Sequence, residues 1–351
     1  MDKRAGPFLC LVCLAAVGCH APLVFHTESG VSLRTPAHVH MELAPQSDHD
    51  ALVECPVPAG AECKAGAKVA VIEVEGVLVN SNCVGPYSVG ENPVDLFKEK
   101  LDAAAADPAV RALVLRVNSP GGAASASDLL LSEVRQFRAR SGKPVVAFLM
   151  DVGAGGAYFV ATGSNEIMAL PSSLVGGIGV VFNLYHGQLA MEQVNFFDQS
   201  IRAGPKIDMG SPVRKLTAEE KQLFDDMAKE YQDRFKAGVL AARPHVAADA
   251  DLFDGRIMTA DQAAHKGLID EVGYLPDAVA AACRLACIPA AQTVIYRRPS
   301  DVARSVYATT ANRPIQNNFA PWSVPGPDRA RLPLFLYMWE PDPAVVRTTG
   351  L

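Results

Sequence analysis

The sequence predicts an α/β fold, because apolar runs of strand length alternate with segments of helical pattern. The strand-like runs that support this prediction span residues 71–76, 112–117 and 144–149. Helices are expected between them, at 92–107 and 124–140. A chain of 351 residues with 49% apolar composition can bury the core of one large domain flanked by tails.

Capping residues mark where the expected helices begin and end. Asn92, followed by a proline, starts the first helix, and Asp107 precedes the proline that ends it. Thr217 and Glu220 form a capping box that opens a long amphipathic helix ending near Arg243. Apolar side chains recur every four residues along that helix, at Leu223, Met227, Tyr231 and Phe235. We interpret this face as packing in the core or at a subunit interface.

The N-terminus predicts export from the cytoplasm. Lys3 and Arg4 precede an apolar run at 8–17, which is shorter than the ~20 residues that span a bilayer. Residues 1–19 therefore resemble a secretory signal peptide. The small residues before Cys19 resemble the bacterial lipobox. This resemblance implies that Cys19 is lipidated and anchors the protein to a membrane. An ordinary signal peptide with a chance cysteine is the alternative.

The remainder of the chain divides by composition. Residues 20–66 lack clear periodicity and are rich in Pro, His, Gly and Ala, which favours a flexible tether. The main domain is expected at 67–290 and a C-terminal tail at 291–351. The tail contains an apolar run at 333–339. We expect it to pack on its own domain or on a neighbour, with contact to membrane or substrate as the alternative.

Cysteine spacing suggests one disulfide and no metal site. Cys55 and Cys63 close a short loop and are disulfide candidates in an oxidising envelope. Cys283 and Cys287 stand four residues apart on an expected helix, where core packing is the simpler interpretation. No Cys/His cluster has zinc-ligand spacing, so we expect no metal.

Charge and motifs exclude two classes of partner. The formal net charge is −6, and the basic residues are interspersed with acidic ones, so no nucleic-acid surface is predicted. Neither Gly-x-Gly-x-x-Gly nor a P-loop pattern is present, so no cofactor is expected.

Two glycine-rich junctions suggest where chemistry would occur. Residues 151–158 follow an apolar strand and open a helix, and residues 118–122 close the preceding strand. Glycines there allow close backbone approach, and amide N–H groups at a helix N-terminus stabilise a developing negative charge.

Together these segments resemble the signal peptide peptidase A (SppA-like) family, membrane-associated Ser/Lys peptidases with a ClpP/crotonase-like fold. The resemblance runs from about residue 68 to residue 286. It rests on the strand at 71–76, the Ser-Pro-Gly-Gly turn within 118–122, the Gly-Gly-Ile-Gly-Val segment at 176–180 and a signature at 260–273. It implies one main domain built as a spiral of ββα units, with the active-site loops after the strands.

The resemblance also assigns the site. The family places its nucleophilic serine before a Gly-Gly pair, and this chain has Ala154 there. It assigns the oxyanion hole and substrate contacts to the amides of three glycines, Gly121, Gly122 and Gly155. The family's basic lysine lies three residues after a glycine. Here Lys206 follows Gly204 by two residues, so it is a displaced general-base candidate, and Ile207 takes the aligned position.

Other hydroxyl groups could in principle replace the missing serine. Ser119 belongs to a turn that family members carry beside their nucleophile, and Ser164 lies about ten residues beyond Ala154. Ser125 and Ser127 lie at the start of the helix expected after Gly122, and we interpret them as capping or surface hydroxyls. Asp151 is interpreted as exposed or capping.

Three hypotheses follow. The first is an inactive, envelope-anchored relative that binds peptides or signal-peptide remnants, or regulates an active paralogue. Losing the nucleophile costs ~10⁶ in kcat, which favours it. The second is a working peptidase with a non-standard nucleophile. The third is crotonase-like thioester chemistry. A homo-oligomer, or assembly with a paralogue, is expected in each case, on the periplasmic side of a bacterial inner or outer membrane.

Overall fold

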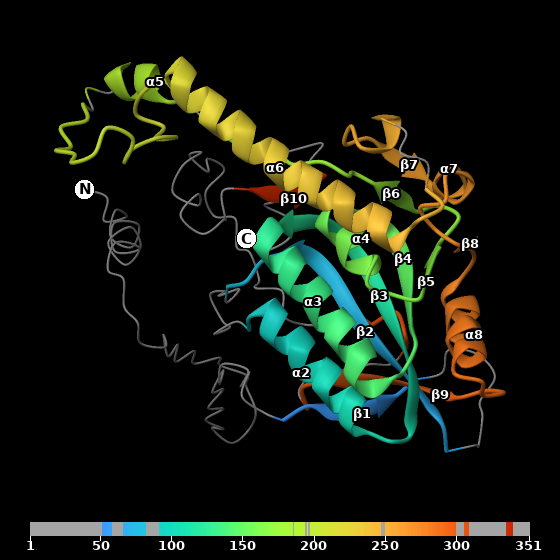
Figure 1. Cartoon of the computed structure of the whole chain (residues 1–351). Coiled ribbons are helices and arrows are strands. Elements are labelled where there is room, and N and C mark those ends of the chain that lie inside the picture. The colour runs from blue at the N-terminus through green and yellow to red at the C-terminus, as the bar shows by residue number, and fades with distance from the viewer. Residues whose placement is uncertain are drawn as a thin grey trace, which may run out of the picture. The chain divides into compact units, whose positions relative to one another are not determined.

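One mixed sheet organises the part of the chain that the computed structural model describes (Figure 1). The described residues are 51–57, 66–81, 91–184, 186–193, 195, 197–246, 250–299, 305–308 and 335–339. The predictions for the signal peptide, for Cys19 and for Cys63 lie outside these residues. The expected α/β class is confirmed.

The strands are β1 (Val53–Pro56), β2 (Lys68–Leu78), β3 (Val110–Ala123), β4 (Val145–Ala154), β5 (Glu166–Ala169), β6 (Leu174–Gly176), β7 (Ile257–Thr259), β8 (Glu271–Val272), β9 (Gln292–Arg297) and β10 (Leu336–Met338). The helices are α2 (Pro93–Ala106), α3 (Ala124–Ser141), α4 (Gly156–Ala161), α5 (Gln188–Gln193), α6 (Ala218–Ala242), α7 (Ala260–His265) and α8 (Leu275–Leu285), with a 3₁₀ turn, η2 (Ala250–Leu252).

The strand order is β1-β9-β2-β3-β4-β5-β8, and β2, β3, β4 and β5 run parallel. Helices α2 and α3 connect consecutive parallel strands, as parallel pairing requires. Strand β4 pairs with β5 along its first half and with β6 along its second half. Two successive strands thus share one neighbour, and β4 ends between β3 and β6.

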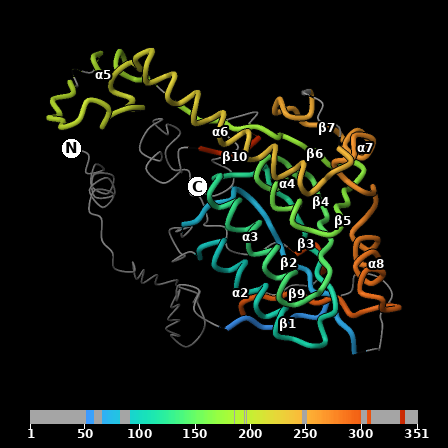
Figure 2. Tube along the Cα trace, viewed as in Figure 1, coloured from blue at the N-terminus to red at the C-terminus, as the bar shows by residue number. Residues whose placement is uncertain are grey.

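Alternate residues of the central strands enter two separate cores, because side chains alternate between the faces of a sheet. Ile72 and Leu115 belong to the core beneath α2, α3, α4 and α6. Val71 and Val114 belong to the core beneath α8. The tube in Figure 2 shows α8 apart from the group of α2, α3 and α4. Both faces of the central strands are covered, so most of their side chains are apolar, with Glu73 of β2 and Arg116 of β3 as buried exceptions.

The predicted helix starts are confirmed. The Asn92 side chain accepts a hydrogen bond from the Val94 N–H at 3.0 Å, immediately before α2. Thr217 and Glu220 form the reciprocal capping box of α6, at 3.2 and 2.9 Å. Helix α3 ends at Gly142, whose left-handed conformation has φ 66°.

The sheet extends beyond both expected boundaries of the domain. Strand β1 lies within the predicted tether and pairs antiparallel with β9, which lies after residue 290 and pairs in turn with β2. The sequence analysis did not place β1 or β9 in the domain, because each strand pairs with residues far away in the chain. Cys55 is part of β1. Its pairing with Cys63 stays a prediction, because Cys63 lies outside the described residues. Cys283 is buried on α8, as expected, whereas Cys287 is exposed and not in the core.

A buried cluster of charges was not anticipated. Glu73 of β2 lies 2.9 Å from Lys100 and from Arg297, and 3.8 Å from Arg116. Burial alone would raise the pKa of Glu73, but Lys100, Arg116 and Arg297 hold that pKa below its ordinary value. Arg116 also donates hydrogen bonds to the carbonyls of the described segment 305–308.

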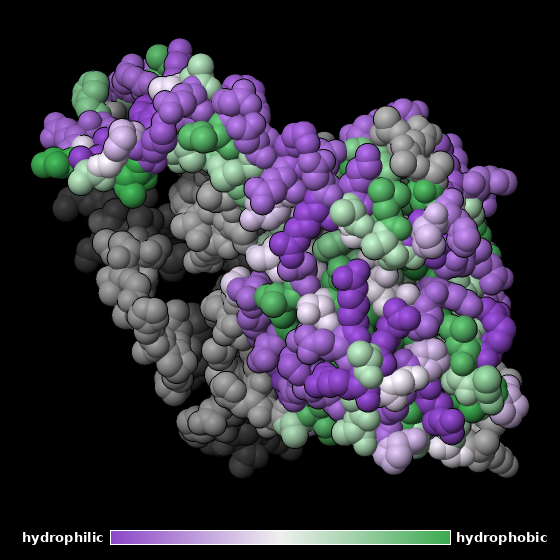
Figure 3. All heavy atoms as spheres, viewed as in Figure 1, coloured by the Kyte–Doolittle hydropathy of each residue, from purple (hydrophilic) through white to green (hydrophobic). Residues whose placement is uncertain are grey.

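The first half of α6, together with α5 and the residues between them, forms an arm that extends past the end of the sheet (Figure 1). Large apolar side chains are exposed on this arm, at Leu189, Phe197, Ile201 and Ile207. Figure 3 shows apolar atoms among polar ones on the same arm. Among the described residues, no helix combines the length and apolarity needed to cross a membrane.

Candidate active site

The predicted strand-turn-helix junction is present at the end of β4. Ala154 is the last residue of β4, lies opposite Gly176 of β6 and is fully buried. Gly155 follows with φ 55° and ψ −128°, and α4 begins at the next residue. A side chain at Gly155 would be strained by this positive φ and would overlap the backbone of Tyr337.

The second glycine-rich junction lies beside the first. Residues 118–122 continue β3, and Ser119 pairs with Gly153 of β4. Gly121 has φ 103°, and a Cβ atom on it would lie 2.7 Å from the amide nitrogen of Gly156. The fold therefore brings the two junctions together, as the resemblance implied.

Two of the three amides assigned to an oxyanion hole, those of Gly121 and Gly155, donate hydrogen bonds within the chain. The Gly121 N–H donates to the Ser119 hydroxyl oxygen at 3.1 Å. The Gly155 N–H donates to the Gly176 carbonyl at 2.9 Å. In this structure both N–H groups are therefore engaged within the chain, and their assignment to an oxyanion hole stays a prediction. The backbone freedom of glycine lets each peptide turn toward an acceptor within the chain.

Strand β10, from the C-terminal tail, covers these glycines. It pairs antiparallel with β3, and Tyr337 lies opposite Gly122. The hydrogen bonds at the two ends of this pairing run from Ala124 N–H to Phe335 O at 3.1 Å and from Trp339 N–H to Pro120 O at 2.9 Å. Tail packing on its own domain was one of the expected alternatives, and it is confirmed.

The other edge of β10 is also paired. Val181 and Leu336 exchange two backbone hydrogen bonds, at 3.0 and 3.1 Å. The tail strand is thus held from both sides, between β3 and the segment after β6.

The carbonyl group of Tyr337 points at the junction of the two turns. A Cβ atom on Gly121 or on Gly155 would overlap its oxygen, and one on Gly156 would lie 3.2 Å away. Trp339 lies beside Gly177, where an added Cβ would be 3.3 Å both from the Trp339 Cβ and from the Ala154 Cβ. The Ala154 methyl is therefore enclosed by the tail and by the segment after β6.

Lys206 is not brought to Ala154 within one chain. It is exposed on the arm, where its Nζ lies 2.7 Å from Glu219 near the start of α6. Figure 1 shows that part of the arm at the opposite end of α6 from α4. Ile207, in the aligned position, is 71% exposed on the same arm.

Comparison with known proteins assigns the family. Residues 138–288 match the family described as Peptidase family S49. Salmonella typhi protease 4 is 32% identical over 222 residues, covering 63% of this chain and 35% of that protein. The chain is SppA-like and carries a peptidase family S49 region at residues 138–288. The chloroplastic serine protease SPPA of Arabidopsis thaliana is 33% identical over 227 residues, covering 63% of this chain and 33% of that protein.

The chain spans about a third of the length of these two S49 relatives. A solved structure of the 1510-N membrane-bound stomatin-specific protease aligns with 59% of this chain and 80% of its own, at 18% identity and a TM-score of 0.37. The matched S49 region includes Ala154 and Lys206, whereas β10 lies beyond it.

One of the serines considered as a replacement nucleophile differs from expectation. Ser127 is neither a cap nor a surface residue, because its side chain is fully buried and donates to the Ala123 carbonyl at 2.9 Å. Its Oγ lies against Gly156, where an added Cβ would overlap it. The first turn of α3 therefore packs against the junction at the end of β4, a contact that the sequence did not predict. Ser125 and Asp151 are exposed, as interpreted.

Within the described ranges, no group of three or more His, Cys, Asp or Glu side chains has the arrangement of a metal site.

Proposed function

We propose that this S49 protein binds extended peptides at the glycine-rich junctions and does not hydrolyse them. The observation that carries the proposal is Ala154, which occupies the end of β4 where the family places its serine. A methyl group cannot attack a carbonyl, and loss of a serine nucleophile costs ~10⁶ in kcat.

Two features of the surroundings support the proposal. The amides of Gly121 and Gly155 already donate to acceptors within the chain, so they are not poised to stabilise an oxyanion. Lys206 pairs with Glu219 on the arm, so it offers no base to position 154 of its own chain. Peptide binding needs neither feature, because the backbone groups of β3 that now pair with β10 can pair with another extended strand once β10 leaves.

The test is labelling of purified protein with a fluorophosphonate, followed by mapping of any adduct by mass spectrometry. An active S49 relative is the positive control, with hydrolysis of a fluorogenic peptide measured alongside. We expect neither adduct nor hydrolysis. A stoichiometric adduct together with turnover would establish the alternative, an active peptidase with a non-standard nucleophile.

Ser127 is the residue that would carry that alternative, since its hydroxyl lies against Gly156. The Ser127→Ala variant separates the cases. Loss of both label and turnover in this variant would assign the nucleophile to Ser127 and overturn the proposal.

We also infer that the protein forms homo-oligomers through its arm. Phe197, Ile201 and Ile207 are 62%, 102% and 71% exposed there, and grouped exposed apolar side chains mark contact surfaces. The Phe197→Asp/Ile201→Asp variant should lower the mass measured by light scattering. Leu129→Asp, at an exposed leucine of α3, should leave it unchanged. A monomeric native chain would contradict this inference.

Attachment to a bacterial envelope membrane through Cys19 is likewise proposed, on the sequence before that cysteine. The Cys19→Ser variant should lose acyl label and move to the soluble envelope fraction. Unchanged membrane retention would show that another part of the chain holds the protein there.

A further inference from the structure

Strand β10 sits in the sheet as a bound peptide would. It forms backbone hydrogen bonds with β3 on one side and with Val181 on the other. The connection from β9 to β10 is long, since Arg297 ends one strand and Leu336 begins the other. Its backbone contacts do not depend on side-chain identity, which makes it exchangeable with any strand of suitable side chains.

The side chains of β10 alternate between two sets of neighbours. Leu336 and Met338 belong to a small apolar cluster with Val77 and Val79. Phe335 and Tyr337 enter the opposite side, where they meet aromatic rings. A slip of one residue would exchange the two sets, so the register is specified by the pockets.

The aromatic pocket is the more selective of the two. The Phe335 ring stacks on Phe182 and on Tyr231, with centroids 4.9 and 4.7 Å apart and interplanar angles of 23° and 17°. The Tyr337 ring contacts Phe235 at 4.8 Å and Phe159 at 5.7 Å. Offset and edge contacts of this kind favour aromatic over aliphatic side chains.

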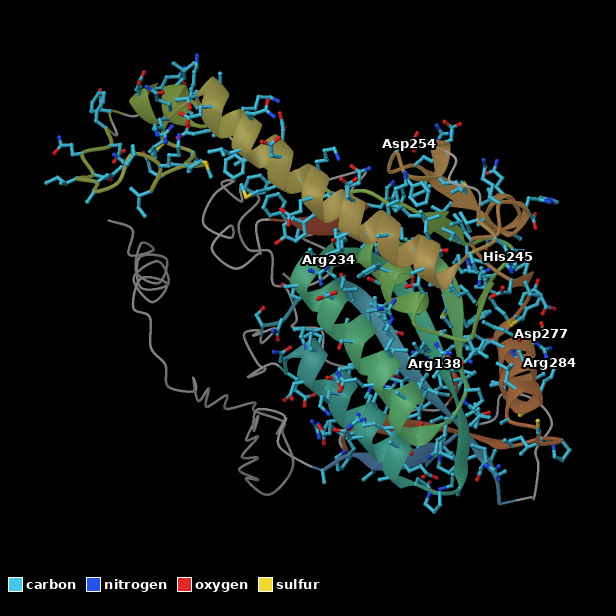
Figure 4. All side chains as sticks on the ribbon, in the orientation of Figure 1. Arg138, Arg234, His245, Asp254, Asp277 and Arg284 are labelled. Carbon is cyan, nitrogen blue, oxygen red and sulfur yellow. The ribbon has the colours of Figure 1, made fainter. Side chains whose placement is uncertain are left out.

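The pocket also recognises a hydroxyl group. The Tyr337 hydroxyl donates to the Tyr231 carbonyl at 2.9 Å. Arg234 of α6 and Asp128 of α3 pair at 2.8 Å. Arg234 is labelled in Figure 4, on α6 over the start of α3. The Tyr231 carbonyl gives a tyrosine at that position a hydrogen-bond partner that phenylalanine would leave unused, which favours tyrosine.

A hollow continues the slot beyond the tail strand. A cavity of about 370 Å³ is bordered by Gly179, Val180, Gly255, Met338 and Trp339. A longer ligand strand would therefore have room to continue past the position of Trp339.

From these contacts we propose that the segment Phe335–Trp339 is a built-in ligand that closes the peptide slot and is displaced by extended peptides of matching pattern. The ligand class is an extended peptide with a Phe-x-Tyr pattern, whose aromatic side chains fill the pocket on α6. This deepens the proposed function and rests on it. Because only the open fraction of the protein can bind, the native chain binds such a peptide more weakly than a chain whose slot is free.

The first test compares how two full-length proteins, the native chain and one variant, bind a fluorescein-labelled peptide with the sequence of residues 332–339, extended by two N-terminal lysines for solubility. The Phe335→Ser/Tyr337→Ser variant removes the resident aromatic side chains. We expect it to bind the peptide on the order of 10–100-fold more tightly than the native chain. In a control peptide of equal composition, the Phe and the Tyr stand three positions apart, on opposite faces of an extended strand, and this peptide should bind at least about 10-fold more weakly.

The second test locks the segment in place. Val181 and Leu336 pack in the same apolar cluster and exchange two backbone hydrogen bonds, and such antiparallel partners have Cα atoms about 5.5 Å apart, within disulfide range. The Val181→Cys/Leu336→Cys variant, with the cross-link verified by mass spectrometry, should bind no peptide when oxidised. Reduction should restore binding.

The outcomes separate the two proposals. Equal binding by the oxidised and reduced lock, or no gain in the double serine variant, would show that the segment is not exchanged and would overturn the inference. If the folded double serine variant bound both peptides equally, the slot would lack the aromatic preference while peptide binding stood. Binding of neither peptide by that variant would overturn the proposed function as well.

Discussion

The carbonyl oxygen of Tyr337 occupies the space that a Cβ atom on Gly121 would fill. The same oxygen would overlap a Cβ atom on Gly155, so a residue of the C-terminal tail reaches the meeting point of two turns that belong to different strands. Under the proposed function, a bound peptide would place one of its own carbonyl groups where the chain places that of Tyr337.

A side chain at Gly121 should disturb this arrangement. Gly121→Ala introduces a Cβ that overlaps the Tyr337 carbonyl at a residue with φ 103°. Gly142→Ala is the control, because its φ of 66° is also positive but nothing lies within 4 Å of the added atom. Urea denaturation should show a loss of about 1–2 kcal/mol for the control from backbone strain. Gly121→Ala should lose about 1–3 kcal/mol more from the clash. Equal losses of unfolding free energy in the two variants would mean that the tail moves away from the added Cβ atom without loss of stability.

The hydroxyl of Tyr337 should contribute to stability through its hydrogen bond to Tyr231. Tyr337→Phe should cost about 0.5–1.5 kcal/mol, and Tyr337→Ala about 3–5 kcal/mol because the ring contacts are lost as well. Thermal unfolding monitored by circular dichroism measures both. If Tyr337→Phe cost as much stability as Tyr337→Ala, the contacts of the aromatic ring would contribute nothing, which would contradict this prediction.

The same residue predicts a stability change at alkaline pH. Burial raises the pKa of Tyr337 to about 12, above the value near 10 of an unfolded tyrosine. Its contribution is therefore complete below about pH 10 and is lost as the pH rises through about 12. The free energy of unfolding of Tyr337→Phe should fall less over this range than that of the native chain. Tyr307→Phe, at an exposed tyrosine, should behave like the native chain.

The buried charge cluster should make the protein sensitive to acid. Glu73→Gln leaves Lys100, Arg116 and Arg297 without their shared carboxylate and should cost about 3–5 kcal/mol at pH 7. Asp102→Asn, which breaks an exposed pair with Lys98, should cost less than about 1 kcal/mol. Equilibrium unfolding in urea compares them, and equal costs would contradict the role of burial.

Acid titration gives the sign of the same effect. The pKa of Glu73 in the folded protein lies below its ordinary value of 4.5, although burial opposes the shift, because Lys100, Arg116 and Arg297 favour the carboxylate. Its stabilisation is present above about pH 4.5 and is lost as the pH falls through the lower folded-state pKa. The Glu73→Gln variant should show a smaller decrease over that range. A decrease equal to the native one would mean that other carboxylates carry the acid response.

Restoring the serine should not restore hydrolysis. Ala154→Ser places a hydroxyl beside Gly177 and Trp339, with the Gly155 amide bound to Gly176 and Lys206 on the arm. A serine without a base is a weak nucleophile, so fluorogenic peptide turnover should stay at background. Substantial turnover by this variant, absent from Ala154→Val, would show that a base reaches position 154.

The sequence specified those features that depend on neighbouring residues. The caps at Asn92 and Thr217, the end of α3 at Gly142 and the strand-turn-helix junction at Ala154 all rest on contacts within a few positions. The order of the motifs was enough to indicate the S49 family, because motif order survives differences elsewhere in the chain.

Only the tertiary structure shows which residues from distant parts of the chain lie next to Ala154 and the glycine-rich junctions, and which do not. No local pattern indicates that Tyr337 lies opposite Gly122, that Ser127 is buried against Gly156, or that Lys206 lies on an arm. Each relationship joins residues whose separation along the chain bears no relation to their separation in space. Strand pairing and burial depend on which surfaces meet, so only the folded chain determines that the tail closes the slot.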